Sequence, residues 1–456
     1  MKLILALMLV LVAIMVVRGS EETPKIVQAS EILAKIKAGQ PAEFDNCIIE
    51  GDLNLRALKI DGPVHFNHTI FRDSAIFASA TFKGTAYFMS STFNGTAEFG
   101  SSTFNGNADF ESSTFNGNAD FLSSTFNGKA YFVFSTFNRE ARFGSTTFND
   151  KVDFESSTFN GNAYFLSSTF NGLANFSYST FNGATYFWGS SFNGTASFWF
   201  STFNGNVDFL SSAFKGEAYF DNTIFNKVAS FDGVIFEQNT VFDSSQFKEN
   251  ALLDNTSFQS RLSLTKTRYN KLFIRWHAIE GVLVYDDAAY MSLLNNFKDL
   301  GYFDDYDSCY FQYRKEHRGH PWPLIGNLVE PVEKCIDFFL EVFYGYGTRP
   351  FNAVSFSIAI IGVFGIFWRA IGVGGLDDVT GEDDKGWEKP DGIFDVLSFS
   401  TTIFLSGTKL FIDPPVIPKI KGRSRSIVKK VFIVERILGA LFSILFFLAI
   451  SGTVIR

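Results

Sequence analysis

The stretch FNGNADFLSST, from Phe115 to Thr125, is the unit from which about half of this chain is built. Phenylalanine recurs at spacings that alternate between five and six residues, and this ladder continues from Phe66 to Phe258. Of its 36 positions 35 are phenylalanine, and the exception is Leu253. Other apolar residues keep the same register outside the ladder, so the regular segment runs from about Ile49 to about Tyr269.

Alternation of five and six matches neither the 3.6-residue period of a helix nor the two-residue period of a strand. It fits a solenoid in which each short side of a coil contributes one inward residue, with coils stacked at about 4.8 Å. Small residues two positions before many phenylalanines predict a second, narrow inward position. Glycines two positions after phenylalanine are interpreted as turn residues that need a permissive backbone, and neighbouring asparagines as side-chain ladders. Examples of the three sets are Ala108, Ala119 and Ala163; Gly106, Gly117, Gly128 and Gly161; and Asn105, Asn116 and Asn127.

The units NADFL and STFNG resemble those of the pentapeptide-repeat proteins, which carry a central Leu or Phe with a small residue two positions before it. The sixth residue of alternate units departs from that pattern. The resemblance implies a right-handed, four-sided β-helix, which we assign to residues 49–270. Four ladder positions would then make one coil. A repeat fold of this kind says little about function.

Composition limits the classes of function. The chain has 456 residues with a net charge of −8, which argues against a nucleic-acid partner. Its three cysteines, Cys47, Cys309 and Cys335, are too few and too scattered for a disulfide framework or a zinc site. No nucleophile–base pair, phosphate-binding loop or metal-ligand cluster is visible in the sequence. We therefore expect no catalytic residues, no metal and no cofactor, and a protein that is not an enzyme.

Three apolar stretches predict export and membrane insertion. Leu3 to Val17 follows Lys2 and fits a signal peptide or an N-terminal anchor within residues 1–20, with residues 21–48 as a lead-in to the repeats. Phe351 to Trp368 and Ile437 to Ile455 are long enough to cross a bilayer as helices. A lipid bilayer is therefore an expected partner, and we expect a multi-pass protein of the cell membrane.

The connector, residues 271–350, is predicted to contain three helices. Asp286 to Gly301 and Asp304 to Arg318 have acidic starts, and the second ends in basic residues. We expect these two to form a hairpin that caps the open end of the solenoid. Leu324 to Tyr346 has the amphipathic, aromatic character of an interfacial helix.

Between the two long apolar stretches lies a shorter one, Gly392 to Thr408, which is rich in Ser and Thr. Residues 351–456 resemble the two-transmembrane, potassium-channel-like domain found at the C-terminus of some pentapeptide-repeat proteins. That resemblance implies a re-entrant pore helix at Ser398 to Leu405 and a filter beginning at Ser406. The sequence departs from the family where Lys409, Leu410 and Phe411 replace the expected aromatic residue and second glycine. The pore-lining candidates are Thr401, Thr402, Ser406, Gly407, Thr408 and Lys409.

Small residues in the last apolar stretch predict close helix packing, because Gly439 and Ser443 stand four residues apart. The resemblance as a whole predicts ion transport by a homo-oligomer, a tetramer if it is a channel, with a monovalent cation as the expected ion. The alternative is a surface protein whose β-helix recognises a partner and whose C-terminal helices only anchor it. The ion, the gating stimulus and the ligand of the β-helix stay open.

The distribution of basic residues predicts the orientation. Six of them precede the last apolar stretch: Lys419, Lys421, Arg423, Arg425, Lys429 and Lys430. Only Lys334 and Arg349 stand close before the first of the pair. Positive residues stay inside, so the loop between the spans is expected in the cytoplasm and the β-helix outside it. The channel resemblance conflicts with this, because pore loops of that family enter from outside.

Overall fold

The computed structural model describes residues 24–318, 330–371, 392–408, 412–415 and 425–451. The chain divides into two compact units, Met1–Leu300 and Gly301–Arg456, and each is described by itself. The predicted signal peptide or anchor at residues 1–20 lies outside the described residues.

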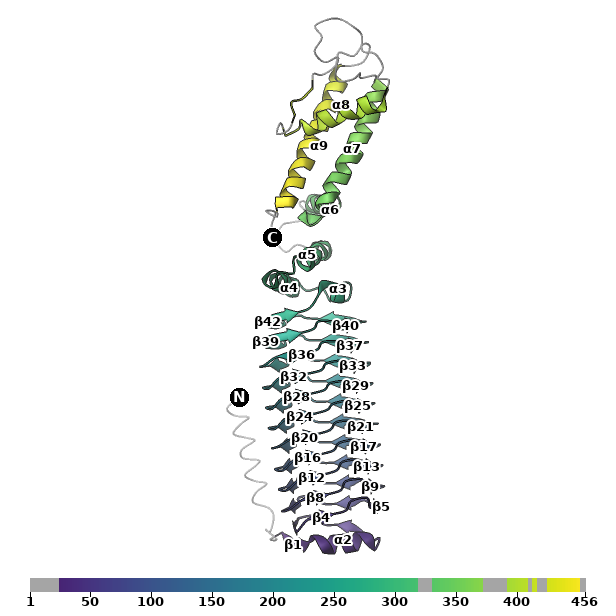
Figure 1. Cartoon of the computed structure of the whole chain (residues 1–456), viewed down its shortest axis with the longest axis vertical. Helices are drawn as coiled ribbons and strands as arrows, with labels where there is room; N and C mark the ends of the chain where they lie inside the picture. The colour runs from purple at the N-terminus through teal and green to yellow at the C-terminus, as the bar shows by residue number, and fades with distance from the viewer. Residues whose placement is uncertain (1–23, 319–329, 372–391, 409–411, 416–424, 452–456) are drawn as a thin grey trace. The chain divides into compact units, whose positions relative to one another are not determined.

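The first unit is a parallel β-solenoid of about 11 turns over residues 25–273 (Figure 1). One coil consists of four short strands, and each strand pairs in parallel with the strand one coil further on. For example, β15 pairs with β19 through Thr114↔Thr136 and Phe115↔Phe137. Because Phe137 is the fourth ladder position after Phe115, the four-sided coil predicted from the sequence is confirmed. The strands of that coil are β15 (Thr114–Phe115), β16 (Ala119–Asp120), β17 (Thr125–Phe126) and β18 (Ala130–Tyr131), and β19 is Thr136–Phe137.

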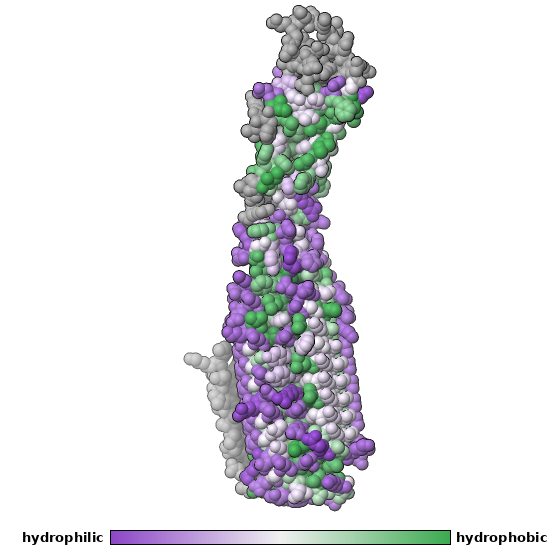
Figure 2. Space-filling model, in the orientation of Figure 1, coloured by the Kyte–Doolittle hydropathy of each residue, from purple (hydrophilic) through white to green (hydrophobic). Residues whose placement is uncertain are grey.

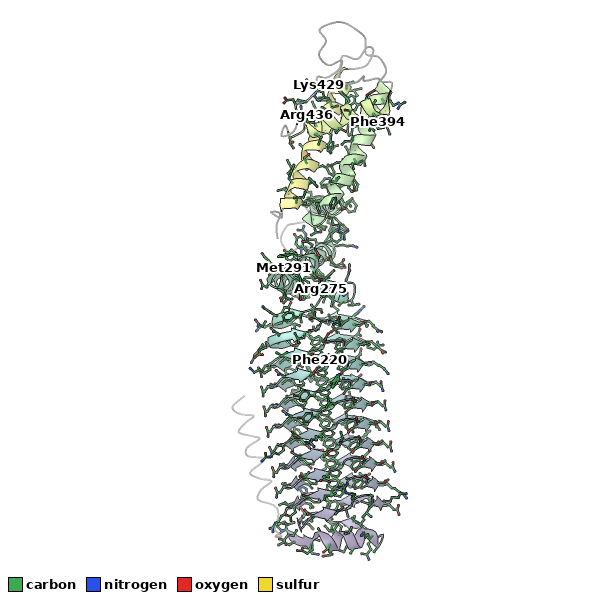
Figure 3. All side chains as sticks on the ribbon, viewed as in Figure 1. Phe220, Arg275, Met291, Phe394, Lys429 and Arg436 are labelled. Atoms are coloured by element: carbon green, nitrogen blue, oxygen red, sulfur yellow. The ribbon has the colours of Figure 1, made fainter. Side chains whose placement is uncertain are left out.

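Stacked phenyl rings fill the solenoid, as the inward ladder predicts. Phe159 is fully buried, and its ring lies 4.7 Å from those of Phe137 and Phe181, 5° from parallel in both pairs. Figure 3 shows Phe220 inside the solenoid, in a neighbouring column where it stacks on Phe198 at 4.9 Å. Adjacent columns meet edge to face, as Phe159 and Phe165 do at 6.2 Å. Both arrangements are favourable for aromatic rings, so each phenylalanine contributes ring contacts as well as buried area.

The small residues and the asparagines also lie as the sequence predicts. Ala108, Ala119 and Ala163 are fully buried. Asparagine amides form ladders along the solenoid, for example from Asn127 Nδ2 to Asn105 Oδ1 at 2.8 Å. These ladders connect successive coils on the outside.

The repeated glycines lie at bends between strands, as the sequence predicts, but a left-handed backbone is not what requires glycine there. Gly106, Gly117 and Gly161 do not have a positive φ. A Cβ on Gly161 would instead lie 2.2 Å from the carbonyl oxygen of Arg139 in the preceding coil, and one on Gly117 would lie 2.2 Å from that of Gly95. Glycine is therefore required because the backbones of successive coils approach closely here. The left-handed corner position is instead occupied by serine in most coils, as at Ser112 (φ 59°).

A buried serine column was not predicted. The second serine of each SST segment is buried and donates to the carbonyl of a phenylalanine in the preceding coil, as Ser113 Oγ does to Phe88 O at 2.6 Å. The regular recurrence of that serine, at Ser91, Ser102 and Ser113, was the available signal. The hydroxyl thus adds a second hydrogen bond to a corner carbonyl, since Phe88 O also accepts from Ser91 N at 3.1 Å, and it connects successive coils.

Both ends of the solenoid are covered. At the N-terminal end β1 (Lys25–Gln28) pairs with β3 (Cys47–Glu50), so parallel pairing begins before the expected start at Ile49. Helix α2 (Ala29–Lys37) lies over this first coil and buries Ile32 and Ile36. The phenylalanine ladder could not reveal this, because the first coil contains a helix in place of strands.

At the C-terminal end, β39 (Gln246–Leu252) pairs with β42 (Arg268–Phe273), and α3 (Trp276–Ile279) and α4 (Asp287–Leu300) follow. The Asn296 side chain of α4 accepts from Leu272 N at 3.0 Å and donates to Leu272 O at 2.8 Å. Asn296 thus occupies the place of a further strand at this edge. The first helix of the predicted cap is therefore present, and the second belongs to the other unit.

The second unit is helical. It consists of α5 (Phe303–His317), α6 (Glu330–Tyr344), the short η1 (Gly345–Gly347), α7 (Pro350–Ile371), α8 (Ile393–Leu405) and α9 (Arg425–Ser451). Much of the outer surface of α7 and α9 is hydrophobic (Figure 2). Exposed apolar side chains include Phe351, Ile358, Val363, Ile366, Ile437, Ile444 and Ile450.

Candidate functional site

Two helices of the second unit are long and apolar enough to cross a membrane, over Pro350–Ala370 in α7 and Ile427–Ile450 in α9. The helix between them, α8, is also apolar but has only 13 residues. At 1.5 Å per residue α8 is about 20 Å long, whereas a bilayer core is about 30 Å thick. Helix α8 is therefore too short to be a third span.

Helix α8 is packed against both long helices. Val396, Phe399 and Ile403 form one apolar cluster with Trp368 of α7 and with Val428 and Phe432 of α9. Phe404 belongs to a second cluster with Ala353 and Phe442. One flank of α8 is thus fully covered, whereas Phe394 at its first turn is 81% exposed (Figure 3).

A fully buried carboxylate connects the three helices. Glu435 of α9 accepts a hydrogen bond from Trp368 Nε1 of α7 at 2.7 Å and another from Ser400 Oγ of α8. The Ser400 hydroxyl also lies 3.0 Å from the carbonyl of Ile361 in α7. A carboxylate inside an apolar helix is costly unless it is hydrogen-bonded, and such residues mark functional sites more often than structural ones.

The sequence offered a signal for this site. Glu435 is the only acidic residue of α9. Trp368 and Ser400 were not singled out, because their connection to Glu435 depends on the fold.

Two glycines bring α8 and α9 into backbone contact. A Cβ on Gly439 would lie 1.8 Å from the Phe404 carbonyl oxygen, and a Cβ on Gly407 would lie 2.2 Å from that of Arg436. Gly439 therefore has the packing role that its spacing predicted, with α8 as the neighbour. Ser443 is half-buried. Gly407, expected to face a pore, lies against α9 at Arg436 and Ala440.

The hydroxyl groups of the remaining pore-lining candidates bond within α8. Thr401 donates to Leu397 O and Thr402 to Ser398 O, both at 2.8 Å. The buried Ser406 donates to Ile403 O at 2.7 Å. Thr408 is the last described residue before the gap at residues 409–411, so Lys409 lies outside the described residues. The structure thus gathers five of the six candidates at the C-terminal part of α8, near α9.

The positively charged side chain of Arg436 lies at the C-terminal end of α8. Arg436 Nη2 of α9 lies 3.4 Å from the carbonyl oxygen of Ser406. A cation at this position complements the negative end of the helix dipole of α8. It also places a guanidinium where a filter for cations would begin.

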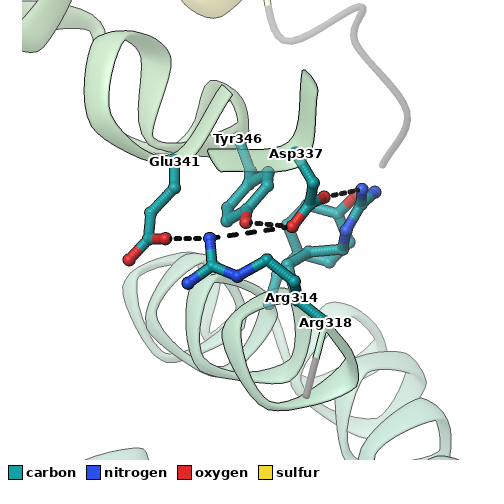
Figure 4. A network of polar contacts seen from close by, with 6 residues as sticks. Arg314, Arg318, Asp337, Glu341 and Tyr346 are labelled. Atoms are coloured by element: carbon teal, nitrogen blue, oxygen red, sulfur yellow. Dashed lines mark hydrogen bonds and ion pairs between the residues drawn. The ribbon is translucent and has the colours of Figure 1, made fainter. Parts of the chain in front are cut away.

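A second polar cluster fastens α5 to α6 (Figure 4). Arg314 Nη2 lies 2.7 Å from one oxygen of Asp337, and Tyr346 Oη donates to the other at 2.7 Å. Arg318 pairs with Glu341. Burial and the hydrogen bond to Asp337 raise the pKa of the Tyr346 hydroxyl, so it remains a donor at neutral pH. This cluster fixes the helix that leads into α7.

The comparisons with known proteins identify the repeats. A family model described as pentapeptide repeats (9 copies) matches residues 59–103, 143–191, 187–235 and 220–268. No curated protein and no solved structure matches the chain. All four matched ranges lie within the β-solenoid, which is therefore built of pentapeptide repeats.

Proposed function

We propose that the helical unit is the pore-forming part of an oligomeric ion channel that carries a pentapeptide-repeat β-helix. The observation that carries this proposal is α8, a helix too short to span that is held between two candidate spans. A membrane anchor needs only α7 and α9. It gains nothing from a third helix whose position depends on a buried carboxylate.

The proposed role of α8 is that of a re-entrant pore helix. Irregular backbone at membrane depth is tolerated only where protein or a water-filled cavity surrounds it. The packing of Val396, Phe399 and Ile403 and the contact of Gly407 with α9 would provide that protection. The segment after Gly407, which leaves α8 beside α9, would line the pore.

Oligomerisation is part of the proposal. A single set of three helices that pack on one another encloses no lumen, and the apolar surfaces of α7 and α9 are available to lipid and to neighbouring copies. We favour a tetramer, following the resemblance to potassium-channel-like domains. Monovalent cations would be the permeant ions, at low conductance, because Arg436 and Lys409 place positive charge beside the pore segment.

The same proposal places the protein in the cell membrane with its β-helix outside the cytoplasm. The support is the excess of basic residues before the last apolar stretch, of which Arg425, Lys429 and Lys430 lie in the first turns of α9. Protease treatment of intact cells tests the orientation. Cleavage of the connector or β-helix in intact cells supports it, and complete protection refutes it.

Ion flux tests the function. The purified full-length protein, reconstituted into liposomes, should release a potassium gradient, and Lys409→Gln should raise the rate because it removes a positive charge near the pore. Absence of flux from the wild type and from Lys409→Gln would refute the channel. In that case the alternative applies, in which α7 and α9 only anchor a binding protein.

A matched pair of variants separates flux through the pore from leakage. Glu435→Ala removes the acceptor that fixes α8 and should abolish flux, whereas Gly362→Ala in α7 adds a methyl group that meets nothing within 4 Å. Gly362→Ala should keep at least half of the wild-type rate. Equal flux from wild type and Glu435→Ala would mean that the ions do not pass through the proposed pore.

A further inference from the structure

One corner of the β-helix carries three exposed aromatic side chains in mutual contact, Tyr178, Trp199 and Phe200, here called the aromatic corner. Their exposed fractions are 46%, 39% and 44%. Tyr178 and Phe200 belong to successive coils, and their rings stack at 5.4 Å, 5° from parallel. The Trp199 ring stands edge-on to both, at 5.3 Å from Tyr178 and 4.9 Å from Phe200.

Aromatic residues are unusual at these corner positions because of the backbone conformation there. Tyr178 and Phe200 have φ angles of 59° and 54°, a left-handed conformation that bulky residues seldom adopt. At the same corner position most other coils carry a small or polar residue, as at Ser90, Ser112, Ser156, Asn222 and Ser244, and one carries a further exposed aromatic residue, Phe134. Large exposed aromatics at a position that favours serine or asparagine need a reason outside folding, and departures of this kind gather at functional sites.

The coils that carry the aromatic corner have no basic residues, and an acidic residue, Asp221, occupies the position of Trp199 in the next coil. From Val152 to Phe214 the sequence contains no Lys and no Arg. Its acidic residues are Asp153, Glu155 and Asp208, and Asp153 is buried and paired with Lys151 at 2.7 Å. The outward residues of these coils are mostly Asn, Ser and Thr, which supply amide and hydroxyl groups.

We infer that the aromatic corner binds a neutral polysaccharide. Aromatic rings stack on the C–H-rich faces of sugar rings, and the flanking amides and hydroxyls match sugar hydroxyl groups. Because Tyr178 and Phe200 are one coil apart, the rings form a platform along the solenoid axis, which suits an extended polymer. A surface without Lys or Arg offers nothing to select a phosphate or an acidic sugar. This inference does not depend on ion conduction by the helical unit.

A protein partner fits the surface less well. Protein interfaces combine aromatic residues with arginine and surround them with a charged, complementary rim that steers association. The coils that carry the aromatic corner lack basic residues, since none occurs between Lys151 and Lys215. An uncharged, hydroxyl-rich polymer is the ligand whose chemistry agrees both with the exposed rings and with a rim that has acidic but no basic side chains.

Native affinity electrophoresis tests the inference with the full-length protein in a polyoxyethylene detergent, which has no sugar headgroup. The probes are hydroxyethyl cellulose, mannan and dextran cast into the gel. At least one should retard the wild type. A triple variant, Tyr178→Ser, Trp199→Ser and Phe200→Asn, should bind that polysaccharide at least tenfold more weakly. Its new residues occur at equivalent corner positions of other coils, so the variant should keep the fold.

Trp188→Leu is the matched control. Trp188 is 53% exposed and lies half a coil from Trp199, and Leu122, Leu166 and Leu210 occupy its position in other coils. This variant should migrate like the wild type. The inference is overturned if none of the three polysaccharides retards the wild type, if the triple variant is retarded equally, or if only Trp188→Leu loses binding. Retardation by heparin in place of the neutral polymers would also overturn it.

Discussion

The β-helix and the helical unit build their interiors in opposite ways. In the β-helix each core contact recurs in the next coil, so the stack of Phe137 on Phe159 is repeated by Phe159 on Phe181. In the helical unit the decisive contacts occur once, at the Glu435 carboxylate and at Gly439. A repeated contact is visible in the sequence and mainly supplies stability. A contact made once positions one helix, and only the fold reveals it.

The largest effect is expected in the phenylalanine stack. Phe159→Ala should lower the free energy of unfolding by about 3–5 kcal/mol, because a fully buried ring is replaced by a cavity. Thr158→Ala, at the outward position of the same strand, should cost less than about 0.5 kcal/mol. Denaturant unfolding followed by far-ultraviolet circular dichroism measures both. A loss below about 1 kcal/mol for Phe159→Ala would contradict the inward register.

The next effect concerns the closest backbone contact of the helical unit. Gly439→Ala should destabilise this unit by about 1–3 kcal/mol, because the new methyl group would press on the Phe404 carbonyl. Gly362→Ala in α7 is the matched control, since a Cβ there meets nothing within 4 Å. The control should be neutral or slightly stabilising, as alanine favours a helix. Thermal unfolding of the helical signal distinguishes the two, and equal melting temperatures would contradict the packing of α8 on α9.

A smaller effect is expected at the buried carboxylate. Glu435→Ala leaves Trp368 Nε1 without its acceptor and Ser400 Oγ with only the Ile361 carbonyl, and it should cost about 1–2 kcal/mol. Glu435→Gln retains a side-chain oxygen as acceptor and should cost less. The emission maximum of Trp368, measured with the other tryptophans replaced by phenylalanine, should shift in the alanine variant. An unchanged spectrum would mean that Trp368 does not depend on Glu435.

The smallest effect belongs to the buried serine column. Ser113→Ala removes one hydrogen bond to Phe88 O and should cost about 1 kcal/mol. Its neighbour Ser112 is exposed and has a positive φ, so Ser112→Gly should be tolerated. Denaturation midpoints of the two variants give the comparison. Equal midpoints would contradict a structural role for the buried hydroxyl.

The repeat made the fold of the first unit predictable almost residue by residue. Its period fixed which side chains point inward and how many residues make one coil. The glycines were misread because a one-dimensional pattern shows that glycine is required but not whether φ or close approach requires it. The helix α2 was missed because its coil contains no phenylalanine of the ladder.

The candidate site was predictable only in part. Length and composition located α7, α9 and the short α8 between them. They did not reveal that Ser400 and Trp368 meet at Glu435, because residues so far apart in the chain share no pattern that a single sequence displays. The sequence also did not show what the Thr401 and Thr402 hydroxyl groups bind. In the structure they donate to carbonyls one turn earlier in α8.

Cysteine accessibility tests most directly whether α8 enters the membrane and returns to the same side. The buried Cys47 and Cys309 are replaced by alanine, and the exposed Cys335 of α6 is kept as a marker. A single new cysteine is then introduced at Phe394 or at Ile412. In sealed vesicles of one orientation, a membrane-impermeant maleimide should label positions 394 and 412 from one side and Cys335 from the other. Labelling of positions 394 and 412 from opposite sides would contradict the re-entrant helix.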